Sequence, residues 1–169
     1  WATEWGWSSY AGPKEMQDLI GVDGQADFTL RRLTLMASQD YQKIFLFALS
    51  DLDERASVRD QHYGLLDLNG EPKPVYSALA RFLEITGPTL KPGVTPVLED
   101  VPKTFYSVAW TREDGKHLLM YWSAEGTRIT LPKVQHAELL DPLTGARQTL
   151  NDYNGIRPVV KPSLQILVW

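Results

Sequence analysis

The chain has 169 residues and a net charge of −4, with 43% hydrophobic and 22% charged residues, the composition of an ordinary globular protein of one or two domains. The negative balance without a basic stripe argues against a nucleic-acid partner, and no apolar run approaches the roughly 18 residues that a membrane-spanning helix needs. The absence of cysteine excludes disulfides, thiolate catalysis and cysteine zinc sites, and no ligand spacing surrounds the histidines, so we expect neither a metal nor a cofactor.

The first predicted unit is a strand, a loop and a helix. Residues 1–4 form a short apolar stretch that ends at Glu4, and the glycines, serines and proline of 6–13 are typical of a loop. Between 23 and 39 apolar residues recur at helical spacing, which predicts an amphipathic helix.

A second unit of the same kind follows. The unbroken apolar run from Ile44 to Leu49 suits a strand buried on both faces, as in a parallel sheet covered by helices. The polar segment 51–62 is a long loop, a kind of segment that often carries function. Pro74 suits a first helical position, and Gly87 with the following proline ends that helix. Strand, loop and helix, repeated, is the order of a βα protein.

Beyond Gly87 the pattern changes. Residues 88–103 hold four prolines and no periodicity, which predicts a semi-rigid linker. Residues 104–169 contain short aromatic and β-branched runs, which predict an antiparallel β-sandwich with Leu164, Ile166 and Val168 on one face. Turn signals separate these runs: Asp114-Gly115, Glu125-Gly126, Thr144-Gly145 and Asn154-Gly155.

Two βα units cannot close a sheet on their own, because both edges of a two-stranded parallel sheet stay open. We therefore expect residues 1–87 to be the last two units of a (β/α)8 TIM barrel, whose earlier part lies outside this chain. The expected fold is α/β plus β: barrel units in 1–87, a linker in 88–103 and a sandwich in 104–169. In such a barrel, residues at the carboxyl ends of strands form the active site.

Several motifs of the chain resemble known enzymes. The strand ending in "TEWGW", the strand ending in "FALSD" and the following "YGLLDLNGEPKPVYSALARF" resemble the barrel end of clan A glycoside hydrolases. The segment "AELLDPLTGARQTL" resembles the sandwich of glycoside hydrolase family 39. The resemblance implies a retaining glycosidase that acts on a polysaccharide or oligosaccharide, such as a bacterial exopolysaccharide, in a periplasmic or secreted location.

The resemblance gives Glu4 a specific role. In clan A the glutamate that ends the seventh barrel strand is the nucleophile, and the acid/base glutamate follows an asparagine at the end of the fourth strand. No Asn-Glu pair occurs here, since Asn69 and Glu71 are separated by a glycine. The resemblance therefore implies that the acid/base lies on the N-terminal part of the same barrel, outside this chain.

Further substrate-binding residues are expected around Glu4, each with a simpler alternative. Trp5 and Trp7 either wall a sugar site or pack barrel loops. Phe47 aligns with the aromatic residue, usually Trp in the clan, that forms the floor of the subsite. Asp51 either accepts hydrogen bonds from sugar hydroxyls or belongs to a solvated charge run, and His62 either does the same or is a structural loop histidine.

Two other functions compete with catalysis. The sandwich could be a non-catalytic carbohydrate-binding module, with Trp110, Trp122 and Trp169 as its platform. That alternative leaves the βα units unexplained, and Trp122 lies in the middle of a strand, where core packing is usual. The sandwich could instead be a purely structural domain that buttresses a barrel.

Overall fold

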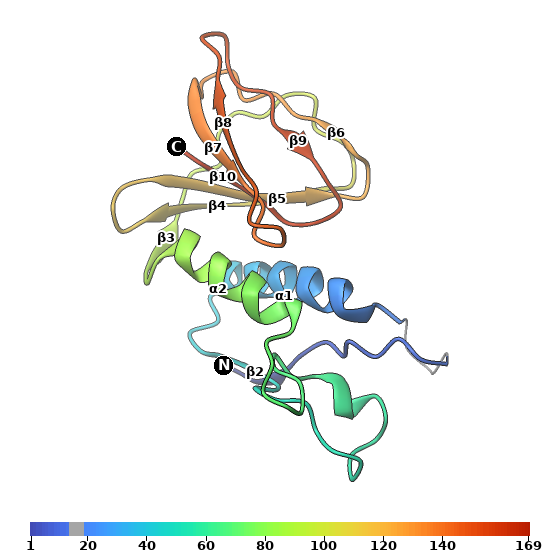
Figure 1. Cartoon of the computed structure of the whole chain (residues 1–169). Coiled ribbons are helices and arrows are strands. Elements are labelled where there is room, and N and C mark those ends of the chain that lie inside the picture. Colours follow the sequence, from blue (N-terminus) through green and yellow to red (C-terminus); the bar gives the residue numbers. More distant parts are fainter. Residues whose placement is uncertain (14–18) are drawn as a thin grey trace. The chain divides into compact units, whose positions relative to one another are not determined.

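The structure is a computed structural model that describes residues 1–13 and 19–169 (Figure 1). It divides into two compact units, Trp1–Ala80 and Arg81–Trp169. The first unit holds two parallel strands and helical segments, and the second is almost entirely β-structure.

The first unit contains the two predicted βα segments. Strand β1 (Ala2–Trp5) pairs in parallel with β2 (Ile44–Leu46), with Ala2 opposite Ile44 and Trp5 opposite Leu46. Helix α1 (Gly21–Ser38) connects the two strands, as a crossover between parallel strands requires. The expected order of strand, helix, strand and helix is confirmed in the described residues.

Strand β2 is shorter and more exposed than the apolar run predicts. It ends at Leu46, and Phe45 is 51% exposed, so the prediction of a strand to Leu49 buried on both faces is wrong. Beyond Leu46 the backbone pairs with a later segment instead. Ala48 donates to the carbonyl of Tyr63 at 3.3 Å, and Leu66 donates to that of Leu49 at 2.9 Å.

Helix α2 (Pro74–Thr86) begins and ends where the sequence predicts. Pro74 occupies the first helical position, where a missing N–H costs nothing because that group has no partner inside the helix. At the other end Gly87 has a φ of +67°, a conformation that glycine adopts without strain. The Gly87 amide donates to the Leu83 carbonyl at 2.9 Å and so satisfies one of the last carbonyls of the helix.

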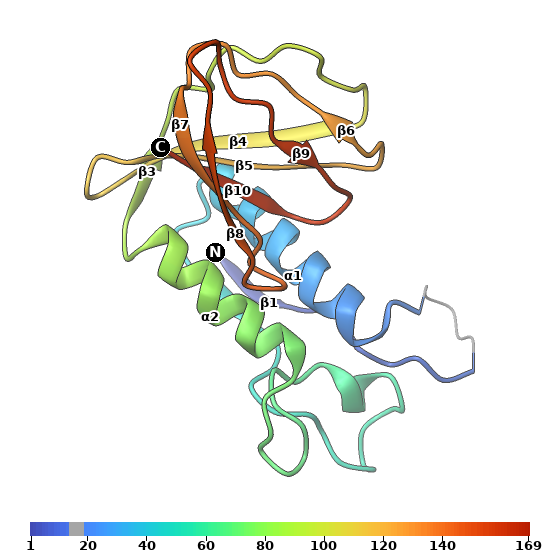
Figure 2. The ribbon, with the colours of Figure 1, turned by 45° about the horizontal axis from the view of Figure 1, so that its top comes forward.

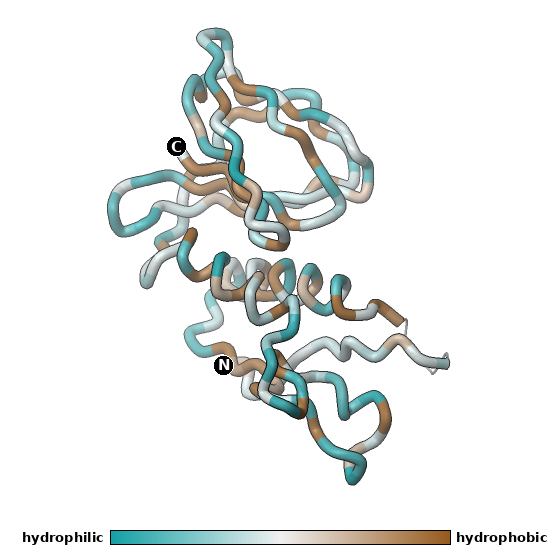
Figure 3. Tube along the Cα trace, in the orientation of Figure 1, coloured by the Kyte–Doolittle hydropathy of each residue, from teal (hydrophilic) through white to brown (hydrophobic). Residues whose placement is uncertain are grey.

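The second unit is built on a six-stranded antiparallel sheet in the order β3-β4-β5-β10-β7-β8, with β6 and β9 forming a separate two-stranded ribbon (Figure 2). One apolar cluster joins the sheet to the ribbon. It contains Leu119, Tyr121 and Leu167 from the sheet, Val160 from β9 and Ile129, which directly follows β6. Figure 3 shows hydrophobic residues along the central strands near the C-terminus. The strands are β3 (Leu90–Pro92), β4 (Phe105–Arg112), β5 (His117–Ser123), β6 (Thr127–Arg128), β7 (His136–Leu140), β8 (Arg147–Asn151), β9 (Val159–Val160) and β10 (Gln165–Val168).

Two predicted turns connect hairpins of this sheet. Gly115, with a φ of +84°, lies between β4 and β5, and Gly145, with a φ of +78°, lies between β7 and β8. Strand β10 is buried on both faces: Leu167 belongs to the core cluster, and Ile166 and Val168 are buried as well. Its central position between β5 and β7 explains that burial.

Part of the predicted linker belongs to the sheet. Within 88–103, strand β3 pairs with β4, and Pro92 lies opposite Trp110 at the edge of the sheet, where a proline is tolerated. Glu99 and Thr130 exchange two backbone hydrogen bonds of 2.9 Å. The absence of periodicity in this segment therefore reflects short, edge-type pairing.

Asp141 organises the turn between β7 and β8. Its carboxylate accepts hydrogen bonds from the amides of Leu143 and Thr144 at 3.0 and 3.2 Å, and from Lys161 Nζ at 3.2 Å. Arg81 also donates to two carbonyls of this turn, those of Pro142 and Leu143. Burial opposes ionisation, but the hydrogen bonds from Lys161 and the amides outweigh it, and the pKa of Asp141 lies below its ordinary value.

Candidate functional site

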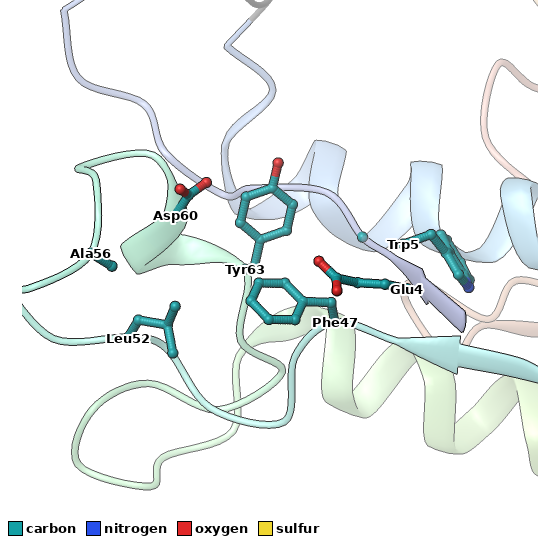
Figure 4. A pocket seen from close by; sticks show the side chains of 8 residues that line it. Glu4, Trp5, Phe47, Leu52, Ala56, Asp60 and Tyr63 are labelled. Atoms are coloured by element: carbon teal, nitrogen blue, oxygen red, sulfur yellow. The ribbon is translucent and has the colours of Figure 1, made fainter. Parts of the chain in front are cut away.

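A cavity of about 420 Å³ opens at the carboxyl ends of β1 and β2 (Figure 4). The carboxyl ends of parallel strands meet at one edge of a sheet, so residues far apart in the sequence converge there. The segment between Asp51 and Tyr63 supplies the remaining wall. The lining residues are Glu4, Trp5, Gly6, Phe47, Leu52, Ala56, Asp60 and Tyr63.

Glu4 and Trp5 leave β1 in different directions. Figure 4 shows the Glu4 carboxylate pointing into the cavity beside the rings of Phe47 and Tyr63, while the Trp5 indole points away from it. Successive side chains of a strand alternate between its two faces, which accounts for the difference. The structure therefore brings Glu4 into the cavity and leaves the Trp5 ring outside it.

Two aromatic rings lie beside the carboxylate. The ring centroids of Phe47 and Tyr63 are 5.7 Å apart, and the rings meet edge to face at 60°. The Phe47 amide donates to the Trp5 carbonyl at 2.8 Å, and the Phe47–Ala48 peptide bond is cis. A Cβ on Gly6 would lie well inside 3.0 Å of the Phe47 carbonyl oxygen, so only glycine allows this close approach of the two strand ends.

Trp7 contacts helix α1 rather than the cavity. Its ring lies 5.3 Å from that of Phe28, centroid to centroid, and 38% of the residue is exposed. Trp7 is not among the lining residues. This contact matches the alternative in which Trp7 packs against neighbouring segments of the fold.

Asp51 is held in a buried ion pair. Its Oδ1 atom lies 2.9 Å from Lys73 Nζ and accepts a hydrogen bond of 2.7 Å from the Gly64 amide. The side chains of Asp51 and Lys73 are only 10% and 9% exposed. The geometry thus assigns Asp51 to anchoring its loop, and the sugar contact expected for it is not favoured by this arrangement.

His62 lies in the same anchored segment. Its ring stacks on Tyr10 with centroids 5.5 Å apart, and its carbonyl accepts hydrogen bonds from the Ser9 amide at 2.9 Å and Lys73 Nζ at 3.1 Å. His62 is not among the residues that line the cavity. These contacts match those of a structural loop histidine.

Asp60 and Tyr63 were not anticipated from the sequence. Asp60 lies on the short helix η1 (Asp60–His62), with its Oδ1 atom 3.7 Å from Arg59 Nε, and Tyr63 follows directly. No periodicity marks either residue, because both belong to an irregular loop. The available signal was the position of an aromatic residue directly before Gly64, at the return of a long polar loop.

The tryptophans of the sandwich do not form an exposed platform. Trp110 and Trp122 are 6% and 5% exposed, and Trp169 packs against the apolar cluster. Trp122 also stacks on Tyr106, with ring centroids 5.6 Å apart. The burial of Trp110 and Trp122 therefore contradicts, at these two residues, the platform expected for a carbohydrate-binding module.

Within 1–13 and 19–169, His, Asp and Glu side chains nowhere gather in groups of three or more that could hold a metal ion. In the same described part of the chain, each helix is too short or too polar to cross a membrane.

Solved structures share this chain's arrangement of a parallel βα pair followed by antiparallel β-structure. A family 39 glycoside hydrolase from the gut symbiont Bacteroides cellulosilyticus WH2 matches with a TM-score of 0.68 and 20% identity, over 98% of this chain and 32% of that chain. The catalytic domain of GH30 xylanase C from Talaromyces cellulolyticus matches with a TM-score of 0.57 and 12% identity, over 98% of this chain and 39% of that chain. This chain thus spans about a third of the chains it resembles. No family model and no curated protein matches it.

Proposed function

We propose that this chain is part of a retaining glycoside hydrolase, with Glu4 as its nucleophile. The observation that carries the proposal is the Glu4 carboxylate, which points from the end of a parallel strand into a cavity beside two aromatic rings (Figure 4). The motif resemblance to family 39 and the fold likeness to glycoside hydrolases of two families support it. We further propose that β1 and β2 are strands seven and eight of a TIM barrel.

The proposed reaction is a double displacement. Glu4 attacks the anomeric carbon as the glycosidic bond breaks, and a second carboxyl group protonates the leaving oxygen. Water, deprotonated by that second group, then releases the sugar from Glu4. In retaining enzymes the two carboxyl groups lie about 5–5.5 Å apart. We propose that the second group belongs to the barrel part outside this chain, as the resemblance implies.

The cavity walls suggest how a sugar would bind. Phe47 and Tyr63 offer aromatic faces for the apolar C–H face of a pyranose ring, and the phenol of Tyr63 can also exchange hydrogen bonds. Asp60 borders the same cavity and can accept hydrogen bonds from sugar hydroxyls. We assign this role to Asp60 in preference to Asp51, because Lys73 and the Gly64 amide already occupy Asp51 Oδ1.

The substrate class rests on the resemblance alone. We propose a polysaccharide, in particular a bacterial exopolysaccharide, and correspondingly a periplasmic or secreted location. The same resemblance places the nucleophile on Glu4, so the test of that residue comes first.

The test is covalent labelling and substitution in the complete barrel protein. A 2-fluoro glycosyl inhibitor should label Glu4, found by peptide mapping, because the fluorine slows release of the glycosyl-enzyme. Glu4→Gln should abolish turnover, while Glu71→Gln, the same change at an exposed turn residue, should leave it unchanged. Labelling of a different residue, or retained turnover in Glu4→Gln, would refute the assignment.

A further inference from the structure

Gln25 of helix α1 is buried where two chain segments of the candidate site come together. It is 1% exposed and is one of three buried polar residues of this helix, with Thr29 and Thr34. Its Nε2 atom is within hydrogen-bond distance of four backbone carbonyls: Trp7 at 2.9 Å, Gly64 at 3.2 Å, Tyr63 at 3.3 Å and His62 at 3.4 Å.

The four carbonyl oxygens of this cluster require a hydrogen-bond donor. The NH₂ of a glutamine is an uncharged donor, so it can face four carbonyl oxygens without burying a charge, and its two N–H bonds are shared among them. Without Gln25, the Trp7 and Gly64 carbonyls would lose this donor, at a cost of about 1–3 kcal/mol for each one left unsatisfied, whereas the His62 and Tyr63 carbonyls keep other donors. Gln25 Oε1 is itself buried without a hydrogen-bond partner in the described part of the chain. The fold therefore tolerates one unsatisfied oxygen in order to keep the donor in place.

The four carbonyls belong to the two segments that shape the cavity. Trp7 follows the strand that carries Glu4, and 62–64 is the segment that carries Tyr63. These segments also touch directly, since a Cβ on Gly6 would lie 3.0 Å from a ring carbon of Tyr63. Gln25 thus connects the segment after β1, the strand that carries Glu4, to the segment that carries Tyr63. Gln25 is not itself among the residues that line the cavity.

We propose that Gln25 is a positioning residue of this active site, which sets the placement of Tyr63 against Glu4. The inference rests on the proposed glycosidase function. Gln25 acts through the backbone of the two segments and not through substrate. A displacement of about 1 Å between reacting groups can reduce a rate by roughly 10²-fold. Loss of the hydrogen bonds from Gln25, which we call the Gln25 clamp, should therefore lower kcat.

The test compares Gln25→Met with Thr34→Val in the complete barrel protein. Methionine keeps the length of the side chain and removes the N–H donors. Thr34 is a buried polar residue of the same helix, 1% exposed, that donates to the Leu30 carbonyl at 2.9 Å. Both variants should lose stability. At a temperature where both are folded, Gln25→Met should lose about 10–100-fold in kcat with little change in KM, and Thr34→Val should keep the wild-type kcat.

A second variant uses pH as the readout. In Gln25→Glu an ionised carboxylate would face four carbonyls, whereas the protonated acid can still donate one hydrogen bond. The ratio of kcat/KM in this variant to that in the wild type should therefore rise as the pH falls. A ratio that is independent of pH would contradict the clamp.

Hydrogen exchange gives a readout that needs no activity. Peptides covering 62–66 should exchange faster in Gln25→Met than in Thr34→Val, because the segment loses its anchor. Unchanged exchange there, or an unchanged kcat in Gln25→Met, would overturn the proposal. Labelling of a residue other than Glu4 in the wild type would instead overturn the proposed function, and the exchange experiment would still test the clamp.

Discussion

Replacement of Lys73 by methionine tests the anchor beneath the candidate site. Lys73 Nζ lies 2.9 Å from Asp51 Oδ1 and 3.1 Å from the His62 carbonyl oxygen, and the two charged side chains are about nine-tenths buried. Methionine preserves the apolar stem but removes the charge. Asp51 would keep the Gly64 amide, at 2.7 Å, as its remaining hydrogen-bond donor from this cluster.

The magnitude follows from the burial of the pair. Removing one partner of a buried ion pair leaves an uncompensated charge and typically costs about 3–5 kcal/mol. In Asp51→Asn/Lys73→Met no such charge remains, and the loss should fall to about 1–2 kcal/mol, the scale of the hydrogen bonds lost. The double variant should therefore be more stable than Lys73→Met alone, with a coupling of about 2 kcal/mol or more.

Thermal unfolding of both single variants and the double variant measures this cycle. At about 2–4 °C per kcal/mol for a chain of 150–250 residues, Lys73→Met should lower Tm by at least about 6 °C. Lys103→Met, at an exposed lysine, is the matched control and should shift Tm by less than about 2 °C. A small shift for Lys73→Met, or a double variant less stable than the single one, would refute the reasoning.

Two further predictions concern single residues. Asp141→Ala should cost the sandwich about 2–3 kcal/mol in urea unfolding, because it removes the ion pair with Lys161 and two amide contacts. The pKa of Asp141 is lowered in the folded state, so this contribution is present above the unfolded value of about 3.9 and is lost as pH falls through the folded pKa. The stability gap between wild type and Asp141→Ala should therefore close in acid, and a constant gap would count against the ion pair. Gly64→Ala should destabilise by more than about 2 kcal/mol, since its Cβ would lie well inside 3.0 Å of the Asp51 amide nitrogen, whereas Gly126→Ala, with open space around it, should be neutral. Equal effects of the two substitutions would show that the close approach at Gly64 is relaxed at no cost.

Local signals in the sequence predicted the elements well where a residue type has a fixed conformational preference. Pro74 and Gly87 bound α2 because proline suits the first helical position and glycine adopts a positive φ. Gly115 and Gly145 marked two hairpins for the same reason. The extent of β2 could not be predicted, because hydrophobicity does not show that Ala48 and Leu49 pair with 63–66 instead of continuing the strand.

Some residues of the candidate site could also be predicted from the sequence, and others could not. Glu4 could be placed from the sequence because the carboxyl ends of adjacent parallel strands lie at one edge, whereas Phe47 was expected only from the family resemblance. The partner of Asp51 could not, because Lys73 lies 22 residues later on the far side of an irregular loop. Tyr63 reaches the cavity through that loop's path, which depends on the buried contacts of Gln25 and not on any local pattern.

In the loop after β2, the residues that anchor the loop differ from the residues that line the cavity at its tip. Its base is fastened by the Asp51 amide on the Leu66 carbonyl at 2.9 Å and the Leu52 amide on the Gln61 carbonyl at 3.2 Å. The Arg59 carbonyl also accepts a hydrogen bond from the Ser8 hydroxyl at 2.7 Å, so the tip is 53–58, which contributes Ala56 to the lining of the cavity. Substitutions in the tip, by evolution or by grafting, can therefore change that side of the cavity while the hydrogen bonds at the base of the loop are kept. Under the proposed function, divergence in substrate choice would then require no change in β1, the strand that carries Glu4.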